Sequence, residues 1–208
     1  MLQFITNTKS DASVVDQIND AMDGGCRWIQ IRIKDASDED IKKIFYTIRD
    51  HAKETETIII LNDRVELAKE LGAEGVAGVH LGKMDMSPAK ARNFLGPEAI
   101  IGVTVNTIED VVALKGLDID YLGIGPFAYT ETKENLAPVL GLEGVAEICS
   151  FMDKEGMETA RVAVGGISLK DVVPLVKAGV NGIAVSGAIA NAEKIKEATE
   201  AFIEALPK

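Results

Sequence analysis

Eight short apolar segments alternate strictly with eight amphipathic segments along the 208 residues. This alternation constrains the fold more than any other feature, because it is typical of a parallel sheet whose strands are joined by helices. The expected strands are Gln3–Thr6, Trp28–Arg32, Thr57–Leu61, Gly75–His80, Ile100–Thr104, Tyr121–Gly123, Arg161–Val164 and Gly182–Val185. The expected helices are Ala12–Gly24, Ser37–Glu54, Val65–Leu71, Ser87–Leu95, Thr107–Lys115, Leu142–Glu155, Ser168–Ala178 and Ile189–Leu206. The count favours an α/β fold, a closed (β/α)8 TIM barrel, over a doubly wound open sheet.

The length limits how this barrel is organised. TIM barrels need roughly 200 residues at the least, so the loops must mostly be short. An apolar content of 47% with 19 glycines fits a globular α/β protein. Because the sequence contains no evident linker or repeat, we expect residues 1–208 to form a single TIM-barrel domain.

Composition also restricts the partners. A net charge of −11 argues against nucleic acid, and no apolar run reaches the 18 residues of a membrane span. The segment Met1–Thr6 lacks the basic and apolar regions of a secretory signal, so a cytoplasmic location is expected. Cys26 and Cys149 are then expected to be buried thiols rather than a disulfide. The oligomeric state is not predicted.

Polar side chains gather where the expected strands end, which in a barrel is the catalytic face. Gln30, Arg32 and Lys34 alternate along the second strand, and period-two spacing puts all three on the face that points into the barrel mouth. Buried cations need anionic partners. We favour a bound anionic ligand; the alternative is an internal ion-pair network with Asp63 or Asp85.

Two carboxylates follow neighbouring strands. Asp63 comes after Asn62 at the end of the third strand, and Asp85 lies just past the fourth. Two carboxylates with room for water and phosphate oxygens are a usual Mg²⁺ site. The alternative for Asp63 is a structural role, as the N-cap of the helix that begins at Val65.

The two histidines and one lysine carry weaker signals. His80 faces inward at a strand end, where packing and hydrogen bonding are more common than catalysis, so general-base action is the minor alternative. His51 is expected to be solvated on a helix face, and Lys83 to be a solvent-facing loop charge.

Anion-binding chemistry surrounds the other half of the mouth. The segment Gly125–Lys133 follows an apolar strand and opens a loop that runs to Leu140, longer than most connections. It supplies Thr130, Thr132 and Lys133, while Gly165-Gly166 and Ser186-Gly187 follow strands seven and eight, where barrels often bind phosphate. These anion-binding groups predict small phosphorylated substrates. Because no Ser–His–Asp or Cys–His arrangement is visible, the predicted chemistry is ionisation of a leaving group.

These motifs resemble those of the thiamine phosphate synthase (thiamine-phosphate pyrophosphorylase) family over essentially the whole chain. The family's Gln-Leu-Arg-x-Lys appears as Gln30 to Lys34, its Asn-Asp pair as Asn62-Asp63, its Val-His-Leu-Gly…Asp as Val79 to Asp85, and its Gly-x-Gly-Pro…Thr-x-Thr-Lys as Gly123 to Lys133. Thr104 stands where the family usually has serine and keeps the hydroxyl. Gly187 replaces another common serine, leaving only its backbone amide. Residues Glu74 to Gly78 look stretched by a few residues before Val79.

The resemblance implies a magnesium-dependent transferase that joins an aminopyrimidine diphosphate to a thiazole phosphate. It implies that Asp63 and Asp85 bind Mg²⁺, and that the cations Arg32, Lys34 and Lys133 act in catalysis. The diphosphate substrate would be held by Gln30, Arg32, Lys34, Asn62, Thr104 and Lys133, and the thiazole phosphate by Thr130, Thr132, Gly166, Ser186 and Gly187.

Two other functions remain open. A related thiazole tautomerase shares the barrel, but that branch tends to lose the metal carboxylates and the diphosphate-binding lysines, which are present here. A non-catalytic phosphate-ligand sensor is the second alternative, and it would have no use for the carboxylate pair.

Overall fold

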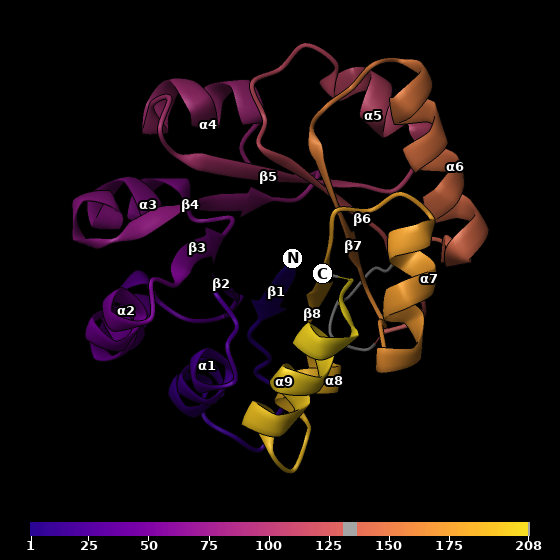
Figure 1. Ribbon diagram of the computed structural model, residues 1–208. Coiled ribbons are helices and arrows are strands. Elements are labelled where there is room, and N and C mark those ends of the chain that lie inside the picture. The colour runs from indigo at the N-terminus through magenta and orange to yellow at the C-terminus, as the bar shows by residue number, and fades with distance from the viewer. Residues whose placement is uncertain (131–136, 208) are drawn as a thin grey trace.

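The computed structural model describes residues 1–130 and 137–207 and contains a closed barrel of eight parallel strands in sequence order. The helices surround the strands, and α8 and α9 lie beside β8 (Figure 1). The strands are β1 (Leu2–Ile5), β2 (Trp28–Ile31), β3 (Ile58–Asn62), β4 (Val76–Leu81), β5 (Ile100–Val105), β6 (Tyr121–Ile124), β7 (Ala160–Val164) and β8 (Gly182–Val185). The helices are α1 (Val14–Asp23), α2 (Asp38–Glu54), α3 (Val65–Leu71), α4 (Pro88–Leu95), α5 (Ile108–Leu114), α6 (Gly141–Lys154), α7 (Val172–Lys177), α8 (Gly187–Ala190) and α9 (Ile195–Ala205), with 3₁₀ turns η1 (Gly72–Glu74) and η2 (Leu169–Asp171). The predicted TIM barrel is confirmed.

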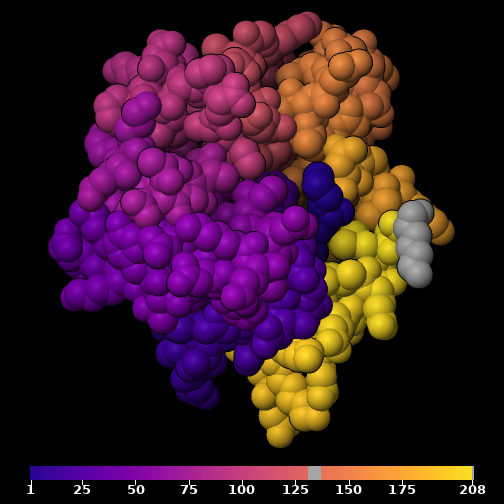
Figure 2. All heavy atoms as spheres, turned by 60° about the vertical axis from the view of Figure 1, so that its left-hand side comes forward, coloured from indigo at the N-terminus to yellow at the C-terminus, as the bar shows by residue number. Residues whose placement is uncertain are grey.

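The barrel closes between its first and last strands. Leu2 of β1 lies opposite Ile183 of β8, and the amino group of Met1 donates to the carbonyl of Asn181 at 3.0 Å. Indigo and yellow atoms, from the two ends of the chain, border one another on the surface in Figure 2. A closed sheet has no unpaired edge strand, which removes a route to aggregation.

Every strand contributes to a small core inside the barrel. Tyr121 is its largest buried member, and the ring of Trp28 meets it edge-on with centroids 4.7 Å apart. The other members are Ile5, Ile60, Ala77, Ile100, Ala160, Val162, Val164 and Ala184. A second, larger core lies between the outer face of the strands and the helices. The interior is therefore filled by side chains, as in other barrels of this kind, which place their chemistry at the mouth.

A β-bulge explains the stretched sequence before Val79. On β3, Ile59 pairs with Val76 and the next residue, Ile60, pairs with Gly78, so Ala77 is the extra residue of β4. A bulge of this kind bends a strand and re-aims the side chains that follow it. The fourth strand begins one residue later than expected and ends at Leu81.

Ser37 caps the N-terminus of α2. The Ser37 hydroxyl accepts the amide hydrogen of Asp40 at 3.2 Å and donates to its carboxylate at 2.7 Å. α2 therefore begins with its free amides partly satisfied.

The predicted single helix Ile189–Leu206 is wrong, because the chain forms two helices with a break at residues 191–194. The Ser10 hydroxyl donates to the carbonyl of Ala190, and the Asn7 side chain donates to the side chain of Asn191 at 3.4 Å. These contacts come from the β1–α1 loop. They satisfy groups at the end of α8, so tertiary structure overrides the helical preference of the segment.

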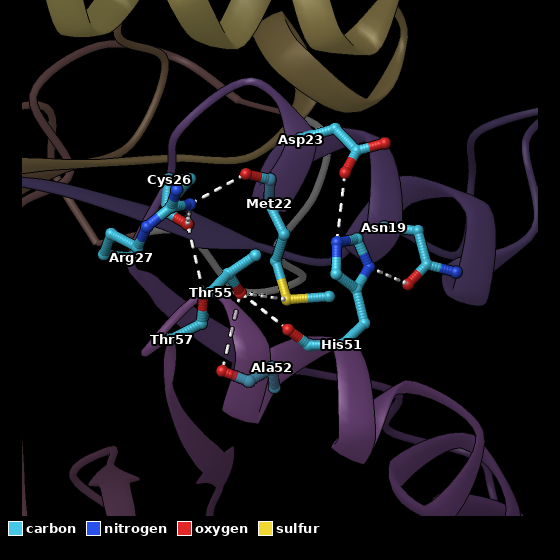
Figure 3. Close-up of polar contacts among 9 residues, drawn as sticks. All are labelled: Asn19, Met22, Asp23, Cys26, Arg27, His51, Ala52, Thr55 and Thr57. Carbon is cyan, nitrogen blue, oxygen red and sulfur yellow. Dashed lines mark hydrogen bonds and ion pairs between the residues drawn. The ribbon is translucent and has the colours of Figure 1, made fainter.

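His51 is also not the solvated residue that we expected. Its Nδ1 lies 3.1 Å from the Asn19 side chain and its Nε2 lies 3.0 Å from the Asp23 carboxylate, and its side chain is 29% exposed. Figure 3 shows the ring between these two residues of α1. Packing of α1 against α2 brings the partners to it. The cluster lies where α2 ends and the chain returns to β3, opposite the barrel mouth.

Both cysteines are buried free thiols, as predicted. Within residues 1–130 and 137–207, no helix is long and apolar enough to cross a membrane.

Candidate active site

Gln30 and Asn62 meet inside the barrel mouth. Gln30 is buried on β2, and its side-chain amide donates to the side-chain oxygen Oδ1 of Asn62 at 3.1 Å. Among the described residues no donor reaches the other atom, Oε1 of Gln30, although it is buried. A buried acceptor without a partner costs free energy. The mouth therefore offers an acceptor suited to a ligand donor.

Arg32 and Lys34 lie beyond the strand on which they were expected, because β2 ends at Ile31. The Arg32 amide donates to the Thr6 hydroxyl at 2.8 Å, which fixes the start of the β2–α2 loop. Arg32 is half-buried and Lys34 is exposed. Lys34 lies close enough to Asp63 for its positive charge to favour the ionised carboxylate.

Asp63 occupies a backbone conformation that few residues adopt. Its φ is +74°, and its amide donates to the carbonyl of His80 at 2.9 Å, so β3 remains tied to β4 past its last residue. Aspartate tolerates this left-handed region better than most residues. The helix α3 has Arg64 at its N-cap position and no side-chain capping bond. The capping alternative for Asp63 is therefore wrong.

The structure places Asp63 beside Asp85. Asp63 is exposed, but partial desolvation, the hydrogen bond with Asp85 and repulsion from its charge raise its pKa to about 6, against the opposing effect of Arg64 and Lys34. Asp85 is also held by the backbone, because its carboxylate accepts the Gly82 amide hydrogen at 2.6 Å. Like charges held this close together repel one another, and this repulsion favours protonation of Asp63.

The pair fits a divalent cation. Mg²⁺ commonly uses one or two protein carboxylates and takes its remaining ligands from water and substrate phosphates. In the part of the chain that the structure describes, no group of three or more histidine, cysteine, aspartate or glutamate residues is placed to hold a metal. Asp63 and Asp85 would therefore hold an open magnesium site.

A chain of hydrogen bonds crosses the barrel beneath the mouth. The Gln3 side-chain amide lies 3.1 Å from the Tyr121 hydroxyl, which lies 2.8 Å from Nδ1 of His80. Nε2 of His80 lies 2.9 Å from the hydroxyl of Thr104. His80 is thus packed and hydrogen-bonded, the interpretation favoured from the sequence.

The side-chain amide of Gln3, at one end of this series of hydrogen bonds, fixes which group donates in each of the others. Gln3 donates its amide hydrogen, so the Tyr121 oxygen accepts and its own hydrogen goes to Nδ1 of His80. Burial raises the pKa of Tyr121 well above its usual range, which keeps that donor protonated. His80 then donates from Nε2 to the Thr104 oxygen. The Thr104 hydroxyl hydrogen remains for another acceptor, such as a phosphate oxygen.

Lys83 is a loop charge, but it has a partner. Its ammonium lies 2.6 Å from the carboxylate of Asp110. Asp110 closes the capping box of α5 with Thr107. Lys83 therefore connects the β4–α4 loop to the N-terminus of α5.

The loops after β6 and β7 pack against one another. The amides of Phe127 and Ala128 donate to the carbonyls of Val164 and Gly165 at 2.8 and 2.9 Å. Gly166 has φ +65°, and an added Cβ would lie 2.6 Å from the Tyr129 carbonyl oxygen. Only glycine fits here, because both the backbone angle and the space exclude a side chain.

The remaining anion-site candidates are placed only in part. Ser186 precedes the short helix α8, of which Gly187 is the first residue, and both are half-buried. Thr130 is half-buried at the end of the first described range, whereas Thr132 and Lys133 lie outside the described residues. Sequence reasoning gave no role to Gln3, Tyr121 or Arg64. The available signal was the polar Gln3 in an apolar strand and the inward phase of Tyr121.

Comparisons with known proteins agree over nearly the full length of the chain. The family model described as thiamine monophosphate synthase matches residues 2–189. A thiamine-phosphate synthase of Bacteroides fragilis is 46% identical over 202 residues, 97% of this chain and 98% of that protein. One of Bacteroides thetaiotaomicron is 47% identical over 192 residues, 92% of this chain and 90% of that protein. The solved thiamine phosphate pyrophosphorylase from Pyrococcus furiosus has a TM-score of 0.83 at 32% identity, covering 98% of this chain and 94% of that chain.

Proposed function

This chain belongs to the thiamine monophosphate synthase family, and from that membership and the geometry of the mouth we propose that it condenses an aminopyrimidine diphosphate with a thiazole phosphate. The products are thiamine phosphate and diphosphate. The relatives are thiamine-phosphate synthases, so the chain is a transferase, and they do not favour the tautomerase or sensor alternatives.

The pairing of Asp63 with Asp85 carries the proposal. Neither alternative function needs two adjacent carboxylates at the mouth, one of which, Asp63, has a raised pKa. A bound Mg²⁺ would offset their charge and that of a diphosphate. The positive charge of Lys34, on the β2–α2 loop, opposes the rise in the pKa of Asp63. Cationic and anionic groups therefore lie close together where a leaving diphosphate would bind.

The charged residues of the site are suited to a dissociative substitution. The bond between the pyrimidine methylene carbon and the diphosphate oxygen breaks, and its electron pair leaves with the oxygen. Arg32 and Lys34 stabilise the charge that develops there. The resulting methylene cation is stabilised by the aminopyrimidine ring, and the thiazole nitrogen lone pair then forms the new carbon–nitrogen bond. No protein base takes part.

Buried groups orient the pyrimidine. The unpartnered Gln30 oxygen accepts a hydrogen from the amino group of the ring, which removes the penalty of an unsatisfied acceptor. The Thr104 hydroxyl, which accepts from His80, donates to a diphosphate oxygen. The glycine turn at Gly166, with Ser186 and Gly187, offers backbone donors to the thiazole phosphate.

The direct test is incubation with both substrates, with and without Mg²⁺, while diphosphate and thiamine phosphate are measured. We expect both products in equal amounts, and only with the metal. Tautomerisation without diphosphate release would establish the first alternative. Binding of either substrate without turnover would establish the sensor.

The hydrogen-bond chain predicts a defect in Tyr121→Phe. The variant loses the donor to His80 Nδ1 and leaves the buried Gln3 amide without its acceptor, which costs about 1–3 kcal/mol of stability. Without a fixed tautomer, His80 no longer always donates from Nε2 to the Thr104 oxygen. The Thr104 hydroxyl hydrogen is then no longer directed to the substrate. We expect kcat/KM to fall about fivefold, equivalent to roughly 1 kcal/mol of transition-state binding. Tyr46→Phe, on the exposed face of α2, is the matched control and should behave as wild type.

A further inference from the structure

Arg64 connects the two sides of the proposed diphosphate site. It follows Asp63 directly, yet its side chain reaches back to the β2–α2 loop that carries Arg32 and Lys34. Its Nη2 lies within hydrogen-bonding distance of the carbonyls of Ile33 and Lys34, at 3.3 and 3.4 Å.

Two more contacts complete the attachment. The same nitrogen donates to the carbonyl of Ala36, and Nη1 pairs with the carboxylate of Asp38, the first residue of α2. One guanidinium therefore spans the loop from its middle to the start of the helix. The Arg64 side chain is 24% exposed, so these contacts are partly shielded from water.

The attachment requires arginine. A planar guanidinium presents five donors in a fixed fork, whereas a lysine ammonium is a single point charge with three rotatable donors. Lysine cannot hold three carbonyls and a carboxylate at once. Arg64→Lys therefore keeps the charge beside Asp63 but releases the loop.

We propose that Arg64 is a positioning residue for diphosphate binding: it fixes the Ile33–Ser37 loop, and so the side chains of Arg32 and Lys34, relative to Asp63. This inference rests on the proposed function and adds to it a residue that touches no reacting atom. Small misplacements of charged groups reduce binding and rate strongly.

A purely structural arginine at the other end of the barrel supplies the control. Arg92 donates to the carbonyls of Gly96 and Pro97 and pairs with Asp118 and Asp120. It ties down the α4–β5 loop, which leads into the amino end of β5 and lies away from the mouth. Arg92→Lys should therefore lower Tm without altering substrate affinity.

The experiment compares wild type, Arg64→Lys and Arg92→Lys in three measurements. They are the KM for each substrate, the Kd for inorganic pyrophosphate with Mg²⁺, and amide hydrogen exchange over residues 33–37. For Arg64→Lys we expect about a tenfold rise in both the KM for the pyrimidine diphosphate and the Kd for pyrophosphate, no change in the KM for the thiazole phosphate, and faster exchange in the loop. Asp38→Asn removes a single contact and should give smaller changes of the same kind.

The outcomes separate the possible roles. Unchanged exchange with weaker pyrophosphate binding means that Arg64 contacts the ligand itself, which overturns the positioning role. Faster exchange with normal affinity also overturns it, since the loop would then be irrelevant to binding. If wild type binds pyrophosphate but forms no thiamine phosphate, the proposed function fails, whereas the exchange and Kd data still decide the role of Arg64.

Discussion

Asp63→Asn is expected to reduce turnover on the order of 100-fold or more while raising the thermal stability of the metal-free protein. Asparagine keeps the shape of the side chain and tolerates the left-handed backbone of this position, so the fold is retained. It lacks the negative charge that would hold Mg²⁺ against the leaving diphosphate. Steady-state turnover at saturating Mg²⁺ measures the loss.

The gain in stability follows from the raised pKa. The folded protein holds a proton on Asp63 up to about pH 6, whereas an unfolded aspartate releases it near pH 4. Protons therefore favour the folded state, and stability falls as pH rises from about 4 to about 6, then stays level. The full shift corresponds to about 3 kcal/mol. Solvent screening of an exposed side chain reduces this to about 1 kcal/mol, or roughly 2–4 °C in Tm at pH 7.

Glu66→Gln is the matched control for Asp63→Asn. It removes one negative charge from an exposed position on the same segment, in the first turn of α3. We expect normal turnover and a Tm that is unchanged or slightly lower, because an acidic residue near a helix N-terminus is mildly stabilising. Addition of Mg²⁺ and pyrophosphate should raise the Tm of wild type and of the control, but not of Asp63→Asn. Near-normal turnover in Asp63→Asn would contradict the proposed site.

The fold was predictable because its signals are local. Each strand is a short apolar run and each helix has its own periodicity, so the order of elements is readable without tertiary information. The carboxyl ends of parallel strands must share one face, which is why Gln30, Asn62, Asp63 and Asp85 could be assigned to one mouth. The stretched segment before Val79 also had a local cause, the bulge at Ala77.

The features that were missed depend on contacts between distant segments. The break after Ala190 is made by Ser10 and Asn7, which no pattern within residues 189–206 reveals. His51 was expected to be solvated because its partners lie on another helix. Arg64 followed two conspicuous site residues, but its contacts depend on where the β2–α2 loop folds back. Long side chains such as arginine have a reach that sequence spacing does not limit.

Gly102 has no side chain and so leaves space for the Tyr121 ring inside the barrel. The position of this ring in turn affects residues at the mouth. An ideal Cβ on Gly102 would lie well inside contact distance of the Tyr121 ring carbons and hydroxyl oxygen. The ring has nowhere to move, since Trp28 meets it edge-on and its hydroxyl is bound to Gln3 and His80. Any displacement therefore reaches His80, and through it Thr104.

Gly102→Ala should accordingly lower stability and activity together. Overpacking a filled core costs about 3 kcal/mol, which corresponds to a fall in Tm of roughly 6–12 °C. Displacement of Thr104 should lower kcat/KM about tenfold, the equivalent of about 1.4 kcal/mol. Gly72→Ala is the control, because an added Cβ there meets nothing within 4 Å and the backbone is helical, so the substitution should be neutral or slightly stabilising. In a Tyr121→Leu background the clash partner is smaller, and Gly102→Ala should then cost less than half as much. An equal cost in both backgrounds would place the strain elsewhere and break the link between this core and the mouth.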